Sequence, residues 1–250
     1  MTVISIVGAG PGATDLLTQR AVEKLKVAEV LIWTDSLIAP EIIELAPENC
    51  EIIPSSALTL EEILNLLIAK SLQGKRVVRL HDGDPCLFGA LSEQINGIKS
   101  AGIDVEVVPG ISAYQATAAK LKAELTAPGI TQTIILTRSN GRIEVPEKEQ
   151  LHHLGSIQAS LCLYLSARHV NEVEETLLNY YPIDTPVAIG YRISWKDEWL
   201  KVVPLNQMAS QTKEKGFFRT TIYIISPALR ANQKRSNLYS PSHKHLFRPN

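Results

Sequence analysis

Residues 76–90 read RVVRLHDGDPCLFGA, an apolar strand that runs directly into a tight turn. Gly83 and Pro85 favour this turn, because glycine adopts backbone conformations that other residues avoid and proline fixes its own φ angle. In open parallel sheets, ligands bind beyond the carboxyl ends of the strands, which is where this turn is expected. The stretch therefore predicts a parallel sheet with a small-molecule site at its edge.

Strands and helices alternate through the first 110 residues. Apolar runs predict strands over Val3–Val7, Val30–Trp33, Glu51–Ile53, Val77–Leu80 and Val105–Val108. Helical periodicity predicts helices over Asp15–Ala28, Thr59–Leu72 and Leu87–Ser100. Thr14 is expected to cap the first of these helices, and Thr59 with Glu62 has the spacing of a capping box. This alternation indicates a mostly parallel sheet covered on both faces.

A second alternating series follows a short helix near 112–119 and a break rich in turn residues, LKAELTAPGITQ. Its expected strands are Thr133–Thr137, Leu161–Leu165, Val187–Tyr191, Glu198–Val203 and Thr221–Ile225. Its expected helices lie near Glu147–His153, Val170–Tyr180 and Asn206–Lys213. The sequence therefore predicts an α/β fold of two domains with mostly parallel central sheets, residues 1–120 and 121–230. The polar, basic residues 231–250 are either a solvated tail or an arm that contacts a partner subunit or an anionic ligand.

The composition is that of an ordinary globular protein. Of the 250 residues, 45% are hydrophobic and 20% charged, and the net charge of −1 gives no basic field for nucleic acid or an anionic membrane. No apolar run approaches the roughly 20 residues of a membrane-spanning helix, and no signal peptide is visible. Three scattered cysteines without a CxxC pair indicate a reducing compartment, so the expected location is the cytoplasm.

The first glycine-rich turn, residues 8–13, reads GAGPGA and satisfies the dinucleotide-binding pattern GxGxxG/A. It follows a predicted strand and precedes a predicted helix, and Asp35 lies at the end of the next strand. However, a pyrophosphate cradle uses consecutive backbone N–H donors, and Pro11 has none. An NAD-dependent oxidoreductase or a non-catalytic nucleotide-binding module therefore stays as an alternative that Pro11 disfavours.

Two histidine pairs raise the question of a metal site. His152 and His153 are adjacent in a predicted helix, and His243 and His245 lie in the tail. Adjacent helical residues face different directions, and no acidic or cysteine partner flanks either pair at ligand spacing. The sequence therefore predicts no protein-bound metal.

Three stretches together resemble the tetrapyrrole (corrin and porphyrin) methyltransferase superfamily, which uses S-adenosylmethionine: VGAGPGATDLLTQRAVEKL, RLHDGDPCLFGA and VEVVPGISA. Further stretches resemble the branch that methylates C11 of precorrin-4 or cobalt-precorrin-4 in cobalamin biosynthesis: ELTAPGITQTIILTRSNGRIEVPE, PVAIGYRISWKDE and RSNLYSPSHKHLFR. The resemblance covers essentially the whole chain. It implies two α/β domains, a methyl donor bound in the cleft between them, a homodimer, and a corrin precursor as the acceptor.

Carried over to this sequence, the resemblance implies a donor site made of Pro11, Asp82, Gly83, Asp84, Leu87, Ser112, Ala113, Leu165, Ile193 and, less directly, Thr221. Apolar members would contact the thioether stem of the donor. Asp84 either pairs with the donor's ammonium group or holds its own loop. The many carboxylates of a corrin precursor call for cations, and arginine forks suit them. Arg138, Arg142 and Arg192 follow predicted strands and are the candidate acceptor-binding residues.

Methyl transfer from a sulfonium needs alignment in a dry site more than it needs a strong base. No catalytic residue is therefore assigned, although His81 or Tyr114 could assist loss of a proton. Another corrin intermediate or uroporphyrinogen III remains the alternative acceptor.

Overall fold

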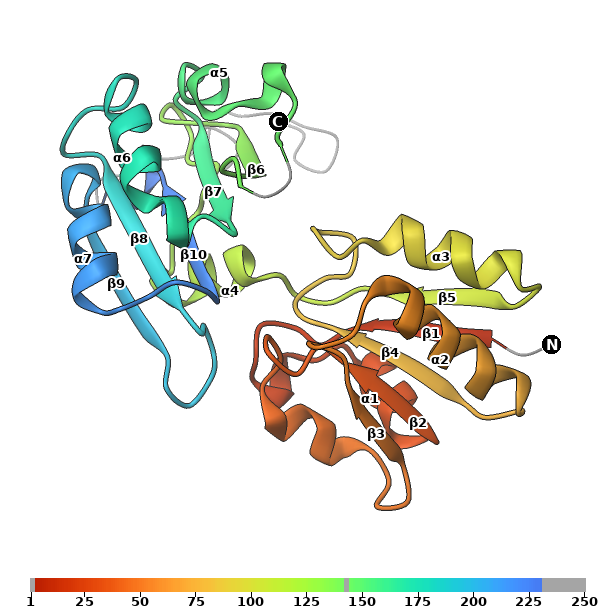
Figure 1. The fold of residues 1–250 in the computed structure, drawn as a ribbon. Coiled ribbons are helices and arrows are strands. Elements are labelled where there is room, and N and C mark those ends of the chain that lie inside the picture. Colours follow the sequence, from red (N-terminus) through yellow and green to blue (C-terminus); the bar gives the residue numbers. More distant parts are fainter. Residues whose placement is uncertain (1–2, 142–143, 231–250) are drawn as a thin grey trace, which may run out of the picture. The chain divides into compact units, whose positions relative to one another are not determined.

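The computed structural model describes residues 3–141 and 144–230, so Arg142 and the tail lie outside the described residues. The described chain divides into two compact units (Figure 1). The first contains the residues up to Ala116 together with Arg192–Glu198. The second contains Thr117–Tyr191 and the residues from Trp199 onward. The short segment Arg192–Glu198 therefore belongs to the first unit, although the sequence places it among the elements of the second.

A five-stranded parallel sheet forms the centre of the first unit. Its strands are β1 (Val3–Gly8), β2 (Val30–Trp33), β3 (Glu51–Pro54), β4 (Val77–His81) and β5 (Asp104–Val108), in the order β3-β2-β4-β1-β5. Every pairing in it is parallel, as the alternation of strands and helices predicts. Each strand lies within one or two residues of its predicted position.

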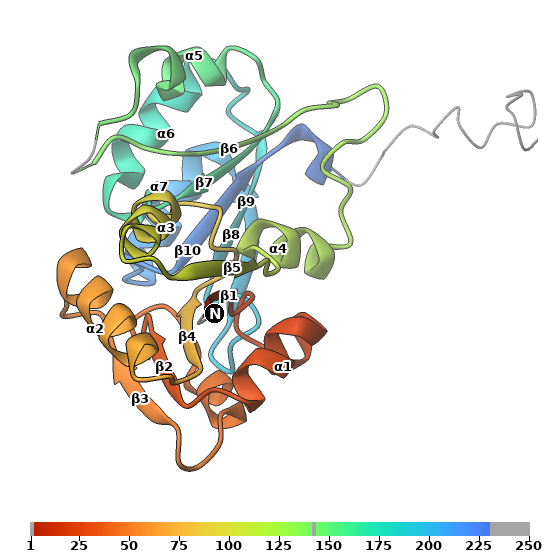
Figure 2. The ribbon, with the colours of Figure 1, turned by 90° about the vertical axis from the view of Figure 1, so that its right-hand side faces the viewer.

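Helices cover both faces of this sheet, because its strands are apolar on both sides. They are α1 (Gln19–Lys26), α2 (Leu60–Leu72) and α3 (Leu91–Ser100), with α1 on one face and α2 and α3 on the other (Figure 2). Alternate residues of β1 serve the two faces: Ile4 and Ile6 pack in the cluster of α2 and α3, and Val7 packs in the cluster of α1. Burial on both faces fixes the register of this interior strand.

Helix α2 begins as the sequence predicts. The Thr59 hydroxyl accepts from the Glu62 N–H, and the Glu62 carboxylate accepts from the Thr59 N–H, so the capping box is confirmed.

Two other helix starts were predicted too early. Thr14 lies in the 3-10 turn η1 (Thr14–Leu16), and Thr18 caps α1 by accepting from the Ala21 N–H at 3.2 Å. The expected helix from Leu87 begins only at Leu91, because Phe88 and Ala90 have φ angles of 57° and 48°, which no α-helix accommodates. Helical periodicity extended across both turns and hid these boundaries.

The second unit contains another five-stranded sheet. Its strands are β6 (Ile134–Arg138), β7 (Ser160–Tyr164), β8 (Pro186–Tyr191), β9 (Trp199–Pro204) and β10 (Thr221–Ile225), in the order β6-β7-β10-β8-β9. The α/β class with two sheets is confirmed. The expectation of a mostly parallel sheet does not hold here, since only β6 and β7 pair in parallel and the other three pairings are antiparallel. A loop instead of a crossover helix joins β8 to β9, and β10 inserts between β7 and β8.

The helices α5 (Leu151–Gly155), α6 (Val170–Leu178) and α7 (Met208–Glu214) share one apolar cluster with this sheet, and the cluster includes the fully buried Tyr223. Helix α4 (Ala113–Leu121) spans the boundary of the two units in the chain, which falls between Ala116 and Thr117. None of the helices in the described part of the chain has the length and apolar content that crossing a membrane requires.

Candidate functional site

Three loops meet at the carboxyl edge of the first sheet. Strand β1 lies between β4 and β5, so the loops after Gly8, His81 and Val108 leave the sheet side by side. The chain order reverses at this point, because β2 and β3 lie on one side of β1 and β5 on the other. A ligand is expected at such a reversal in an open parallel sheet.

Backbone hydrogen bonds join the first two loops. The Ala9 N–H donates to the His81 carbonyl at 2.6 Å. Gly10 and Gly83 then exchange two bonds: the Gly10 N–H donates to the Gly83 carbonyl at 3.1 Å, and the Gly83 N–H donates to the Gly10 carbonyl at 2.9 Å. Both glycines have positive φ angles, 68° and 56°, which explains the residue type at these two positions.

Close backbone approach explains two further glycines. A Cβ atom on Gly8 would lie 2.7 Å from both the Gly83 carbonyl oxygen and the Gly110 nitrogen. A Cβ atom on Gly110 would collide with the same Gly83 oxygen. We call Gly8, Gly83 and Gly110 the glycine junction, since Gly8 ends β1 and each of the other two loops contributes one member.

The Asp84 carboxylate ties the second loop to the third. Its Oδ1 accepts from the Cys86 N–H at 2.8 Å, and its Oδ2 accepts from the Gly110 N–H at 3.0 Å. Of the two roles that the sequence leaves open for Asp84, the structure therefore shows the loop-holding one. Its neighbour Asp82 is an exposed residue at the same edge, although desolvation raises the pKa of its carboxylate.

Residues Arg192–Glu198, which we call the strap, pack against the first loop. The Trp195 indole N–H donates to the Pro11 carbonyl at 3.1 Å, and the Ala13 N–H donates to the Ser194 hydroxyl at 2.9 Å. A Cβ atom on Gly12 would collide with the Trp195 ring, so the strap explains this glycine too. An ion pair of 2.6 Å between Lys196 and Glu41 adds a further contact.

These contacts use up most of the donors in the loop that follows β1. Of the four backbone N–H groups between residues 9 and 13, three donate within the protein, those of Ala9, Gly10 and Ala13. Pro11 has no N–H at all. The loop therefore has one remaining N–H, that of Gly12, and lacks the consecutive donors of a pyrophosphate cradle.

Strand β4 also carries two buried polar side chains. Arg79 donates to the Ser55 hydroxyl at 2.9 Å and to the Gln94 amide oxygen at 3.3 Å, so it has the structural role that a strand-interior arginine suggests. The Gln94 nitrogen lies 3.0 Å from His81 Nε2. Burial, with the Arg79 charge nearby, lowers the pKa of His81 to about 4. His81 is therefore neutral at pH 7 and 6% exposed, which disfavours it as a base for a bound substrate.

Predicted site residues of the second unit gather at one edge of its sheet. Arg138 ends β6 opposite Tyr164, and Leu165 follows β7. Thr221 begins β10 beside Tyr191, the last residue of β8. Leu165 is 65% exposed, so it is no core residue, whereas Thr221 is buried. Arg138 donates to the Glu144 carbonyl at 3.2 Å.

The structure thus divides the predicted residues between two sheet edges. The edge of the first unit holds the following: Pro11, Asp82, Gly83, Asp84, Leu87, Ser112 and Ala113. Ile193, which is buried, and Arg192 join this unit through the strap. The Arg192 guanidinium pairs with Asp197 and lies 4.8 Å from the Trp195 ring centroid.

Sequence reasoning missed Ser194 and Trp195. Both lie in the stretch PVAIGYRISWKDE that carried the family resemblance, but their partners in residues 11–13 are about 180 residues away. The one signal in the sequence was the glycine at position 12, whose missing side chain leaves room for the Trp195 ring.

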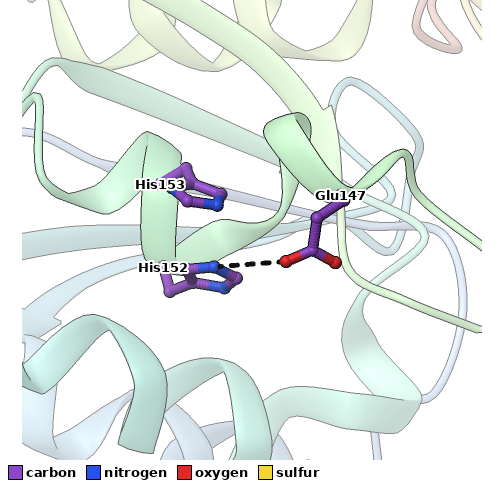
Figure 3. A group of neighbouring side chains, drawn as sticks. All are labelled: Glu147, His152 and His153. Atoms are coloured by element: carbon purple, nitrogen blue, oxygen red, sulfur yellow. Dashed lines mark ion pairs between the residues drawn. The ribbon is translucent and has the colours of Figure 1, made fainter.

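The second unit also brings Glu147, His152 and His153 together. The possible ligand atoms of the three side chains lie within 4.8 Å of one another (Figure 3). Adjacent helical residues are expected to face different directions. The two imidazole rings instead lie close together, with their centroids 4.0 Å apart.

Comparison with known proteins identifies the class. Residues 3–209 match the family described as Tetrapyrrole (Corrin/Porphyrin) Methylases, and the chain belongs to this family. The resemblance that the glycine loops suggested is thereby confirmed.

Individual relatives narrow the likeness. The chain is 38% identical over 247 residues to the cobalt-precorrin-4 C(11)-methyltransferase of Methanocaldococcus jannaschii, covering 98% of this chain and 95% of that protein. It is 37% identical to the precorrin-4 C(11)-methyltransferase of Pseudomonas aeruginosa, covering 100% and 99%. Among solved structures, the cobalt precorrin-4 methyltransferase CbiF matches with a TM-score of 0.88 at 34% identity, covering 92% of this chain and 96% of that one.

Proposed function

We propose that this chain is an S-adenosylmethionine-dependent methyltransferase that methylates C11 of precorrin-4 or cobalt-precorrin-4 in cobalamin biosynthesis. The observation that carries the proposal is the likeness, along nearly the whole chain, to C(11)-methyltransferases of both the cobalt and the cobalt-free kind. Membership of a methylase family supports the reaction type.

The geometry of the first unit favours this donor over a dinucleotide. Its ligand edge lies where the chain order reverses, but the donors for a pyrophosphate are already used. A nucleoside sulfonium has no phosphate, so it does not need the missing donors. The glycine junction packs the three loops against one another, so this edge of the sheet consists of closely packed backbone.

We assign donor contacts to the residues that the first unit brings together: Pro11, Asp82, Gly83, Leu87, Ser112, Ala113 and Ile193. The donor supplies a methyl group already activated on sulfur. These residues then have to orient it and exclude water, and no strong general base is needed. Asp84 acts by fixing Gly110 against the second loop. Leu165 and Thr221 remain donor contacts predicted by the resemblance.

The acceptor carries acetate and propionate groups, so we assign its binding to arginines. Arg138 at the carboxyl end of β6 is the strongest candidate, since it ends a strand and keeps a partly exposed side chain. Arg142 lies outside the described residues and remains a prediction. The Arg192 guanidinium forms an ion pair with Asp197. A role in acceptor binding therefore requires this guanidinium either to contact the acceptor while it remains paired or to leave Asp197.

Two measurements test the proposal. Calorimetry with S-adenosylhomocysteine should show one site per chain, and NAD should give no heat; binding of NAD alone would overturn the methyltransferase class. Labelled donor should then transfer its methyl group to precorrin-4 or cobalt-precorrin-4. Transfer to uroporphyrinogen III alone would refute the C11 assignment and support the alternative acceptor, for which a Thermus thermophilus uroporphyrin-III C-methyltransferase of TM-score 0.76 and 26% identity provides the comparison.

We also propose a homodimer, which the family resemblance supports. Light scattering of the full chain should give twice the monomer mass of 27.5 kDa. A single monomer peak at micromolar concentration would rule this assembly out.

A further inference from the structure

We propose that Glu147, His152 and His153 form a binding site for a divalent transition metal ion, with zinc as the favoured ion. The site would use two imidazole nitrogens and one carboxylate oxygen. It lies on the second unit, and neither the methyl donor nor the acceptor is assigned to it.

Local backbone geometry brings the three side chains together. Glu147 lies in the short 3-10 turn η3 (Glu147–Glu149), and the two histidines lie in α5. Gln150 separates the two elements and has an extended backbone, with φ −66° and ψ 154°. The chain therefore turns at Gln150, and Glu147 folds back toward the helix (Figure 3). His152 Nε2 lies 3.9 Å from Glu147 Oε1.

The distances are close to those of a bound ion. Zinc binds nitrogen and oxygen at about 2.0–2.2 Å, which places two ligand atoms about 3.3 Å apart in a tetrahedral site. All ligand atoms of the group lie within 4.8 Å of one another. Closure needs shifts of about 1 Å in side chains that are exposed, 76% for Glu147 and 40% for His152.

A neighbouring residue orients the carboxylate, as outer partners commonly do around metals. The Gln150 side-chain N–H donates to Glu147 Oε2 at 2.9 Å, which leaves Oε1 toward His152. The two imidazoles and one carboxylate suit zinc, copper or nickel, whereas magnesium prefers an all-oxygen shell. Three protein ligands leave a position for water. A bound ion would connect η3 to α5 and stabilise the folded second unit by mass action.

Titration of the metal-free full chain with zinc chloride tests the site. The background variant His243→Ala/His245→Ala removes the tail histidines from the measurement. We expect one equivalent of zinc to bind, magnesium to give no heat, and cobalt(II) to develop d–d absorption bands. His152→Ala and His153→Ala should each weaken zinc binding at least about 100-fold, and Gln150→Ala, which removes no ligand, about tenfold.

His169→Ala is the matched control, because His169 is also exposed and faces one carboxylate, Glu172 at 3.8 Å, without a second histidine of the described residues in the group. Zinc affinity should be unchanged in this variant. Glu147→Gln should weaken zinc binding and keep the melting temperature of the metal-free protein. Unchanged zinc affinity in His152→Ala, His153→Ala or Glu147→Gln would overturn the proposal, as would the absence of cobalt bands in the unsubstituted protein.

Discussion

At the scale of the single residue, adding a side chain to a glycine has two possible costs in this protein, backbone strain and steric collision. Gly83 and Gly74 both have positive φ angles, but a Cβ atom would meet nothing closer than 3.8 Å at Gly83 and nothing within 4 Å at Gly74. A Cβ atom on Gly110 would instead collide with a backbone oxygen that cannot move aside.

We expect Gly83→Ala and Gly74→Ala to lower the free energy of unfolding by similar amounts, about 1 kcal/mol each, from backbone strain. Gly110→Ala should cost about 3 kcal/mol or prevent folding, because overpacking adds to the loss of loop contacts. Urea denaturation measures all three. A Gly110→Ala variant as stable as Gly74→Ala would contradict the close packing of the three loops.

Asp84 can be assigned by comparing stability with donor affinity. Asp84→Asn replaces one accepting oxygen by an N–H donor, so one of its two loop bonds is lost, at a cost of about 1–2 kcal/mol. We expect a lower free energy of unfolding together with weaker S-adenosylhomocysteine binding. Asp104→Asn, at the exposed first residue of β5 and away from the carboxyl edge, is the control for the change in charge. Loss of affinity at full stability would instead assign Asp84 to the donor's ammonium group.

The buried His81 predicts a pH dependence of stability. Its pKa is about 4 in the folded protein and about 6.5 when unfolded, so the unfolded chain binds more protons between these values. The free energy of unfolding should therefore fall by about 3 kcal/mol, on account of this group, as the pH drops from 6.5 to 4. His81→Gln should flatten that part of the profile. An unchanged slope would show that other groups govern acid unfolding.

At the scale of elements, the strap decides how firmly the loop after β1 is held. Trp195→Phe keeps an aromatic ring beside Gly12 and loses the bond to the Pro11 carbonyl, which should cost about 1 kcal/mol. Trp195→Ala also loses the packing, about 3 kcal/mol. Lys196→Ala removes only a surface ion pair and should leave the stability nearly unchanged.

Thermal unfolding and calorimetry with S-adenosylhomocysteine measure these effects. Donor affinity should fall in the order of the stability losses, because the strap positions Pro11. Equal S-adenosylhomocysteine affinity in all three variants would show that the strap does not influence donor binding.

Most elements were predictable because short apolar runs between turns fix strands locally. The relative direction of the strands was not predictable. Strand β10 has the same apolar pattern as the strands of the parallel sheet, yet it pairs antiparallel with both of its neighbours. The strap was not predictable either, since its contact with Pro11 joins residues 184 positions apart. The glycine-rich loops could be recognised because glycine permits, and proline fixes, particular backbone conformations locally, whereas the role of Asp84 required its partner Gly110.

At the scale of the whole molecule, the two ligands can be tested through different units. Arg138→Ala should weaken macrocycle binding about tenfold or more, because a charge-assisted bond to a carboxylate is lost, and should leave S-adenosylhomocysteine affinity unchanged. Arg168→Ala, in the same unit but with its guanidinium 5.7 Å from the Phe218 ring centroid, is the matched control. Calorimetry with each ligand measures the two affinities. An equal loss of affinity for both ligands would contradict the assignment of Arg138 to acceptor binding.

The strap also determines which fragments of the chain can form a complete first unit. A fragment that ends at Ala116 would contain the loop of Pro11 but not Trp195, and the complementary fragment would carry the strap without that loop. The first fragment therefore lacks part of the first unit, whereas the second fragment holds all of the second unit and the strap as well. Co-expression of the two fragments should therefore restore a folded first unit that expression of residues 1–116 alone does not yield.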